Sequence, residues 1–172
     1  MRNSVKVAIA GVVAAASLAG LIAIVVHARQ DENTTGHLSF ARTEPAAAAF
    51  AEFMEARVAL GKRCLRVLVA STETQRQQGL RDITKLAPYD GMLFVFPGDN
   101  TAQFTMAETP MPLDIAFFDA HGNPVSHRTM TPCPQGTDAT CPVYSSDHKY
   151  RLALETPAGS QSAGGSIGPC AA

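Results

Sequence analysis

Hydrophobic residues are most concentrated between Gly91 and Asp119. Three dense apolar runs follow one another there, separated by Pro, Gly and Asn residues: Met92–Phe96, Phe104–Met106 and Leu113–Phe118. Short apolar runs bounded by turn-forming residues are typical of buried strands. Because no other part of the chain supplies as much apolar area, we expect these runs to form the core of a small β-rich domain.

Segments on both sides of this core alternate between apolar and polar residues. The alternation in Arg63–Ala70 predicts a strand with one face buried. Further strands are expected at Val125–Met130 and Tyr150–Glu155, and Asp119–Asn123 has the composition of a hairpin turn.

A short helix is expected directly after the first of these strands. Thr72 and Gln75 have the spacing of a capping box, and Gly79 is a natural helix end. The predicted fold is therefore α+β and predominantly antiparallel β. It is a small barrel-like or rolled sheet over residues 62–168 with one or two short helices.

Residues 45–61 carry a different pattern. Phe50, Phe53 and Met54 recur at helical spacing in an Ala-rich stretch, so an amphipathic helix is expected. We expect it to pack on the domain, and the alternative is a helix that binds a partner or a membrane surface. The polar residues 29–44 are expected to form a linker, and residues 169–172 a tail.

The N-terminus predicts export. Val7–Val26 is long and apolar enough to span a bilayer as a helix, and Arg2 and Lys6 before it favour retention on the cytoplasmic side. Residues 1–28 thus form either a signal anchor or a signal peptide cleaved near Ala28. The first gives a single-pass cell-membrane protein with an extracytoplasmic domain, and the second a secreted or periplasmic one.

Charge and cysteine content fit this location. The net charge is −1, and removing Arg2 and Lys6 from the 14 basic residues leaves 12 against 15 acidic ones. This balance argues against nucleic acid as a partner, because such binding needs a basic surface. The four cysteines suit disulfides in an oxidising compartment, with Cys133–Cys141 as the first expected pair and Cys64–Cys170 as the second.

The chain resembles the uncharacterised family called domain of unknown function 192, over about Cys64 to Gly168. The resemblance is carried by a series of short motifs: Leu65–Ala70, Gln75–Leu80, Gly91–Phe96, Phe104–Met106, Thr109, Pro112–Phe117, Asp119, Gly122 and Leu152–Glu155. It implies a compact β-rich domain, frequently exported in bacteria, and no established activity. The sequence departs from the family's pattern at Arg81, where Met is usual, and at Glu108, where Asn is usual. The last strand of the family is also longer than the chain allows after Gly168.

Five residues are candidates for a ligand-binding surface: Arg76, Met106, Glu108, Thr109 and Asp114. Asp114 stands in an apolar run where an unpaired carboxylate is costly, and Arg76 is its expected ion-pair partner. Packing in the core also accounts for Met106.

No nucleophile–base order, phosphate loop or dinucleotide-binding pattern is present, and we expect no cofactor and no metal site. The sequence favours a membrane-tethered extracytoplasmic module that binds a small polar ligand, an envelope polymer or a partner protein. The alternative is an envelope hydrolase or another enzyme that uses Asp114 with Glu108 or a histidine.

Overall fold

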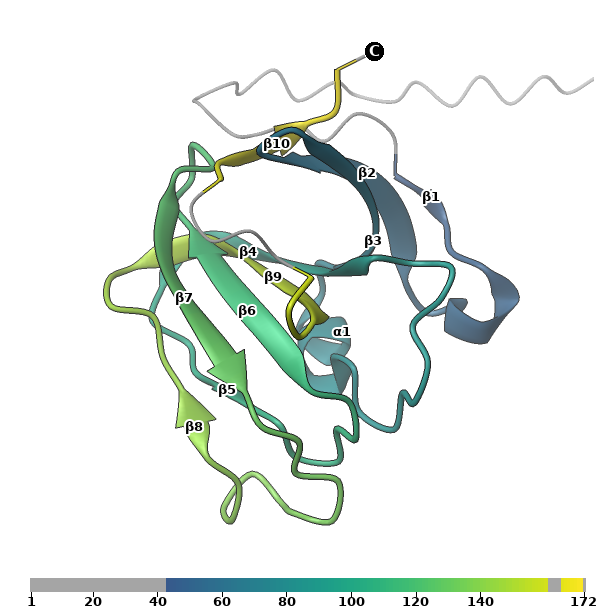
Figure 1. Cartoon of the computed structure of the whole chain (residues 1–172), viewed down its shortest axis with the longest axis vertical. Helices are drawn as coiled ribbons and strands as arrows, with labels where there is room; N and C mark the ends of the chain where they lie inside the picture. The colour runs from purple at the N-terminus through teal and green to yellow at the C-terminus, as the bar shows by residue number, and fades with distance from the viewer. Residues whose placement is uncertain (1–42, 161–164, 172) are drawn as a thin grey trace, which may run out of the picture. The chain divides into compact units, whose positions relative to one another are not determined.

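Alternating and apolar segments pair into one curved sheet of eight strands (Figure 1). Its order is β1-β2-β3-β4-β9-β6-β7, and β10 pairs with β2 beside β1. The strands are β1 (Glu44–Pro45), β2 (Met54–Leu60), β3 (Arg63–Ala70), β4 (Gly91–Asn100), β6 (Leu113–Phe118), β7 (Pro124–Met130), β9 (Tyr150–Pro157) and β10 (Ile167–Pro169). A second sheet joins β5 (Phe104–Thr105) to β8 (Val143–Tyr144).

This computed structural model describes residues 43–160 and 165–171. The leader predicted at 1–28 and most of the linker predicted at 29–44 lie outside that range. Neither described helix has both the length and the hydropathy of a membrane span.

The helix α1 (Glu73–Gln78) lies in the connection between two parallel strands, β3 and β4. Parallel neighbours require a crossover, and residues 71–90 provide it. The crossover begins with α1, whose capping box forms as expected: Gln75 N donates to Thr72 Oγ1 at 3.2 Å, and Thr72 N donates to Gln75 Oε1 at 3.0 Å. Gly79 follows the helix with φ +50°, so the predicted helix end is confirmed.

The helix expected at 45–61 is wrong. That stretch contains β1, one 3₁₀ turn, η1 (Ala48–Phe50), and the seven-residue strand β2. Leu60 pairs with Arg63 across the two-residue loop Gly61-Lys62, and Gly61 has φ +58°. Glycine at the first position of a two-residue loop is typical of a hairpin. The strand is formed in spite of the helical spacing because β2 pairs with β3 on one side and with β1 and β10 on the other.

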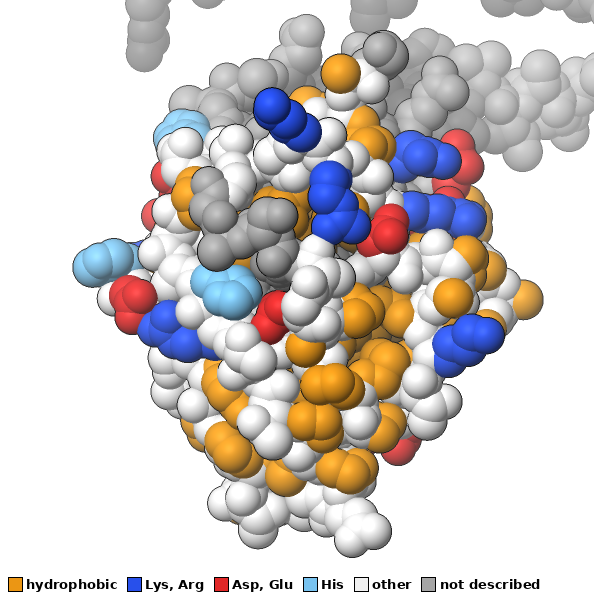
Figure 2. Space-filling model, viewed as in Figure 1, with side chains coloured by type: hydrophobic (Ala, Val, Ile, Leu, Met, Phe, Trp, Pro, Cys, Tyr) orange, Lys and Arg blue, Asp and Glu red, His pale blue; other side chains and the backbone are white. Residues whose placement is uncertain are grey.

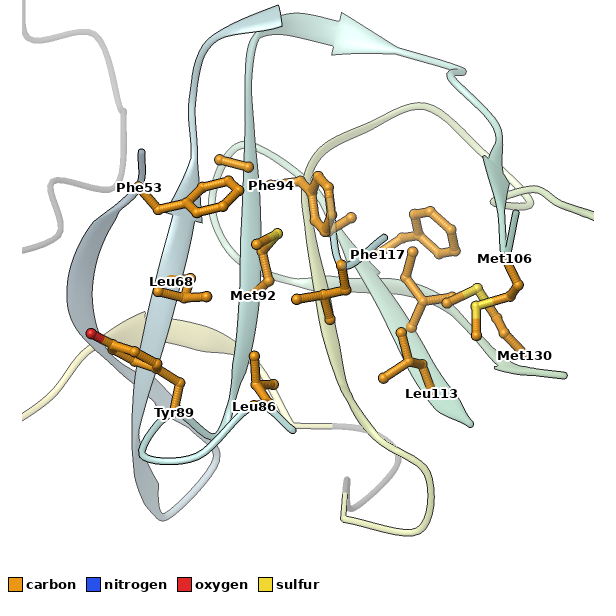
Figure 3. Packing of buried hydrophobic residues seen from close by; sticks show 14 of the residues in the cluster. Phe53, Leu68, Leu86, Tyr89, Met92, Phe94, Met106, Leu113, Phe117 and Met130 are labelled. Carbon is orange, nitrogen blue, oxygen red and sulfur yellow. The ribbon is translucent and has the colours of Figure 1, made fainter. Parts of the chain in front are cut away.

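Both faces of the sheet are covered, which explains why all six residues of β6 are buried. One face carries the first core, which includes Met92, Phe94 and Phe117 (Figure 3). Residues outside the strands, such as Leu86 and Tyr89, pack onto the same core. The other face carries the second core, with side chains from β2, β3, β4, β6, β9 and β10. The side chains of these strands pack against one another on that face, so the sheet curves around the second core.

The sheet does not close into a barrel. Its edges are β7 on one side and β1 with β10 on the other. The hydrogen bond from Ile167 N to Gly122 O, at 2.9 Å, brings β10 to the β6–β7 turn without forming a ladder. The expected α+β, predominantly antiparallel fold is thus confirmed, and the closed form of the barrel is not.

Both expected disulfides are present. Cys133–Cys141 closes a short loop with a Cα–Cα distance of 6.1 Å, and Cys64–Cys170 joins β3 to the end of β10 with a distance of 5.6 Å. The second bond links residues 106 positions apart and holds the C-terminal segment against the sheet.

The surface in Figure 2 shows hydrophobic atoms in the lower centre of the face and charged side chains mostly above and around them. Among the described residues, Val143 is the large hydrophobic side chain that is exposed, at 49%. The other large apolar side chains of the described residues are buried or half-buried, and the half-buried ones pack against the two cores.

Candidate functional site

A pocket of about 690 Å³ opens beside α1, and we call it the α1–β4 pocket. Its walls are α1 with the turn after it, residues of β4 from Phe94 onward, and residues 102–105, which include β5. Asp138 and Thr109 lie on its border, and Glu155 of β9 lines it from the sheet. Clefts of this size are typical of small-molecule sites.

Phenylalanine rings make one wall of the pocket. Phe94 and Phe104 pack edge to face with ring centroids 5.0 Å apart, and Phe104 also meets Phe117 at 5.7 Å. Phe96 packs against Tyr150 at 5.3 Å. Because these rings are fixed by the first core, the apolar wall is formed before any ligand arrives.

Arg76 also lines the pocket, but its hydrogen-bond donors are used within the domain. Its Nη1 donates to the carbonyl oxygens of Ser71 (2.6 Å) and Val95 (2.9 Å), and its Nη2 pairs with Glu73 at 3.0 Å. The guanidinium also lies over the Phe96 ring, 5.1 Å from the centroid. Arg76 therefore ties α1 to β4, and Glu73 balances its charge.

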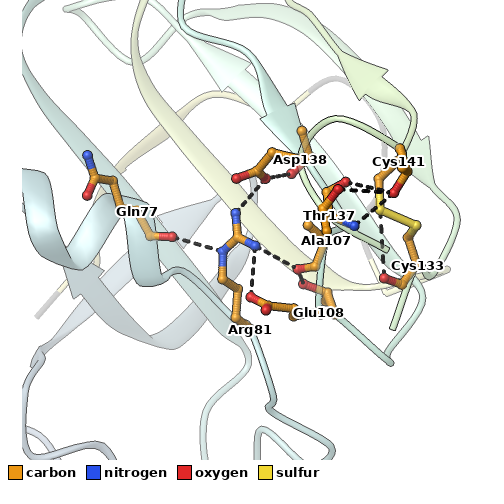
Figure 4. A network of polar contacts seen from close by, with 11 residues as sticks. Gln77, Arg81, Ala107, Glu108, Cys133, Thr137, Asp138 and Cys141 are labelled. Carbon is orange, nitrogen blue, oxygen red and sulfur yellow. Dashed lines mark hydrogen bonds and ion pairs between the residues drawn. A yellow bond between two sulfur atoms is a disulfide. The ribbon is translucent and has the colours of Figure 1, made fainter. Parts of the chain in front are cut away.

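Arg81 is the centre of a second network at the pocket border (Figure 4). Its Nη2 donates to Asp138 at 2.6 Å, and its Nη1 donates to Glu108 at 3.1 Å and to the Ala107 carbonyl at 3.3 Å. Its Nε donates to the Gln77 carbonyl at 3.1 Å. One cation thus connects the end of α1 to two loops that are distant in sequence.

Asp138 receives a second bond, from Thr105 Oγ1 at 2.7 Å. The hydrogen bonds from Thr105 and then from Arg81 hold the pKa of Asp138 below its ordinary value. In return, the hydrogen bond to Asp138 raises the pKa of Arg81. Both groups therefore stay charged around neutral pH.

The loop that carries Asp138 is fixed by the Cys133–Cys141 disulfide. A Cβ on Gly136 would come within 2.3 Å of both sulfur atoms, so the ring leaves room only for glycine there. Glu108 N donates to Cys133 O at 3.1 Å, which joins this loop to the Glu108 turn. The disulfide therefore sets the position of one border of the pocket.

Glu155 is the unusual group of the site. Its side chain is 4% exposed, and burial raises its pKa to about 8. No hydrogen bond or ion pair joins its side chain to another residue within 43–160 and 165–171. A buried carboxyl group without a partner is costly, so it calls for an explanation.

The five residues predicted as ligand-binding candidates do not form one site. Arg76 and Thr109 line the pocket, whereas Met106, Glu108 and Asp114 do not. Met106 is fully buried in the first core, and Glu108 acts on the pocket only through Arg81.

The expected ion pair between Arg76 and Asp114 is wrong. Asp114 accepts from Thr129 Oγ1 at 2.8 Å and from Gly159 N at 2.7 Å. Leu113 and Ile115 on either side of it point into the first core, so Asp114 faces the other side of the sheet. The alternation of the strand thus separates it from the pocket.

Sequence reasoning missed Arg81, Asp138 and Glu155 as site residues. Arg81 and Glu108 are the two single-residue departures noted in the sequence, and that pair of departures was the available signal. The structure brings the two side chains into contact at 3.1 Å. Glu155 ends the Leu152–Glu155 motif, and on this strand it lies on the face opposite to Leu154, which belongs to the second core. The first core covers the Glu155 side of the sheet.

No histidine is among the described residues that line the α1–β4 pocket. In the described part of the chain, no three His, Cys, Asp or Glu residues are grouped as a metal site would require. Asp119 accepts from the backbone N–H groups of His121 (2.8 Å) and Asn123 (2.9 Å), so it stabilises the hairpin turn.

Fold and site together define a small β-rich domain with a preformed, partly aromatic pocket. The chain belongs to the family domain of unknown function 192, described as "Uncharacterized ACR", whose model matches residues 56–166. No curated protein matches it.

Two solved structures are similar to this chain. One, from Sinorhizobium meliloti 1021, is described as a candidate transcription regulator; it is 25% identical, with a TM-score of 0.57 over 77% of this chain and 96% of that one. The other, from Novosphingobium aromaticivorans DSM 12444, is described as a protein of unknown function. It is 20% identical, with a TM-score of 0.61 over 74% of this chain and 92% of that one, and it bears on the fold alone.

Proposed function

We propose that this protein is an exported, membrane-tethered binding module that holds a small polar ligand in the α1–β4 pocket. The observation that carries the proposal is the pocket of about 690 Å³, which combines a fixed phenylalanine wall with amide, hydroxyl and carboxyl groups. Binding sites typically combine an apolar surface with a few polar groups that fix the orientation of the ligand.

Export is supported by two independent features. The sequence carries the apolar segment Val7–Val26 after two basic residues, and all four cysteines are paired in disulfides. Paired cysteines are typical of oxidising compartments outside the cytoplasm.

The hydrolase alternative is less well supported. It required Asp114 beside Glu108 or a histidine, but Asp114 is 5% exposed and bound to Thr129 and Gly159 on the other side of the sheet. Glu108 is turned toward Arg81. A carboxylate pair able to share one substrate is therefore not assembled there.

A pocket-filling variant tests the proposal. A Cβ on Gly98, which lines the pocket, meets nothing within 4 Å, so Gly98→Trp places an indole in open space. Gly168→Trp is the matched control, because Gly168 has the same free space and lies on β10. A library of small polar metabolites is screened by thermal shift against the oxidised full chain.

The expected result is a set of compounds that raise the Tm of the wild type and of Gly168→Trp but not of Gly98→Trp. Compounds that stabilise all three proteins equally would contradict binding in this pocket. Recovery of the protein in the cytosol of expressing cells, with four reduced thiols, would contradict export.

A further inference from the structure

Glu155 lies in the middle of the sheet, on β9 between β4 and β6. Its register neighbours are Met92 and Ile115, and both side chains are fully buried in the first core. Glu155 shares their face and lines the pocket. The carboxyl group is thus surrounded by apolar side chains and faces the space that a ligand would occupy.

The other acidic residues of the pocket already have partners. Glu73 pairs with Arg76, Asp99 with Arg151, and Asp138 with Arg81. Among the described lining residues, Glu155 is the acid for which no such partner is present. The two lining arginines, in turn, are held by carboxylates and by backbone carbonyls.

These contacts favour one charge type of ligand. An anion would have to displace Glu73 or Asp138 from an arginine, which breaks charge-assisted hydrogen bonds. A cation would meet a carboxyl group without a partner and the rings of Phe94 and Phe104, and ring faces attract cations. Its binding would remove the cost of the unpaired buried group.

We infer that Glu155 is the recognition group of the pocket and that the ligand presents an ammonium group to it, attached to an apolar or aromatic body. This inference rests on the proposed function, whose pocket it uses. The N–H donors of the ammonium group bind the Glu155 carboxylate, and the body packs on the phenylalanine wall.

Proton uptake and release follow from this arrangement. With a pKa of about 8, Glu155 holds its proton at neutral pH when the pocket is empty, and it must lose that proton to pair with an ammonium ion. The charged groups around the pocket are Glu73, Arg76, Arg81, Asp99 and Asp138, and each is ion-paired. Affinity for an amine therefore rises as the pH approaches 8.

Three probes of one shape test the inference on the oxidised full chain: benzylammonium chloride, benzyl alcohol and sodium benzoate. Their dissociation constants are measured by NMR titration of the Phe94 and Phe104 resonances. Benzylammonium is expected to bind about tenfold or more tightly than benzyl alcohol, and benzoate most weakly. Glu155→Gln is expected to remove this preference and its pH dependence while it retains the binding of benzyl alcohol.

The wild-type series alone can refute the inference, so the result does not depend on the folding of the variant. Equal affinities, tighter binding of benzoate, or no binding of benzylammonium would overturn it, and so would an unchanged preference in Glu155→Gln. The proposed function would stand in these cases if the library compounds still failed to bind Gly98→Trp. Binding of all three probes that Gly98→Trp leaves unchanged would overturn both.

Discussion

Arg81 Nη2 lies 2.6 Å from Asp138 Oδ1 and joins two segments that are 57 residues apart. The same guanidinium binds Glu108, which has φ +58°, a backbone conformation that asparagine adopts more readily than glutamate. Through these contacts Arg81 connects the Glu108 turn to the loop that carries Asp138. One guanidinium therefore holds together the segments at this border of the pocket.

Removing the Arg81 guanidinium should change the pKa of Asp138. Arg81→Met and Thr105→Val are each expected to raise the pKa of Asp138 toward its ordinary value, because the hydrogen bonds from Thr105 and from Arg81 both stabilise the carboxylate, and Arg81 also supplies a positive charge. Carbon-detected NMR of the Asp138 carboxyl group measures both. Arg63→Met serves as the control, since Arg63 binds the Ser160 carbonyl far from this network. An unchanged Asp138 pKa in both variants would refute the arrangement.

Glu155 should make the domain less stable as pH rises. Its folded-state pKa of about 8 exceeds the ordinary 4.5, so the unfolded chain loses this proton first. The free energy of unfolding should fall between about pH 4.5 and 8, by up to about 1.4 kcal/mol per pH unit. Denaturant melts across this range measure the slope.

Glu155→Gln is the control for that slope, because it keeps the shape and removes the proton. The difference in the free energy of unfolding between wild type and variant gives the contribution of Glu155 alone. Other groups, such as Asp138, affect both proteins equally, and the lowered pKa of Asp138 reduces stability as the pH falls. Parallel pH profiles for the two proteins would show that Glu155 titrates normally.

Gly91 allows β4 to lie against β9. A Cβ there would come within 2.3 Å of the Glu155 carbonyl oxygen and 2.9 Å of Thr156 Cγ2. Gly91→Ala should therefore lower the free energy of unfolding by about 1–3 kcal/mol, as overpacking typically does. Gly98→Ala, on the same strand but with open space, should change it by less than about 0.5 kcal/mol. Equal Tm values for the two variants would disprove the close contact.

The two disulfides should differ in their contribution to stability. In the chain-entropy model, the bond across 106 residues contributes about 4–5 kcal/mol and the bond across 8 residues about 2–3 kcal/mol. Replacing Cys64 and Cys170 together by Ser should thus lower the Tm more than replacing Cys133 and Cys141. The second pair should have the larger effect on ligand binding, because its loop carries Asp138. The reverse order in either measurement would contradict these roles.

Asp114 should be structural. Asp114→Ala leaves the Thr129 hydroxyl and the Gly159 N–H without their acceptor, and a loss of about 2 kcal/mol is expected. Thr129→Val removes one of these bonds and should cost less. Affinity for the pocket probes should not change in either variant, and lost binding with an unchanged Tm would show that Asp114 belongs to the site.

Much of the local structure could be predicted from the residues alone. The Thr72–Gln75 capping box, the turn at Asp119–Asn123 and the strand Arg63–Ala70 depend on hydrogen bonds and alternation within a few residues. The Cys133–Cys141 disulfide also followed from its short Pro/Gly loop, whereas the sequence only offered Cys64–Cys170 as a further possible pair.

Long-range packing decided the rest. Residues 54–60 carry a helical spacing and an alternating one, and strand pairing on both edges selected β2. Glu155 became buried because the first core covers its face of the sheet, and Arg81 met Asp138 through a fixed loop. Local patterns state what a segment can form, but the side of a sheet that is covered, and by what, depends on contacts between residues far apart in the chain.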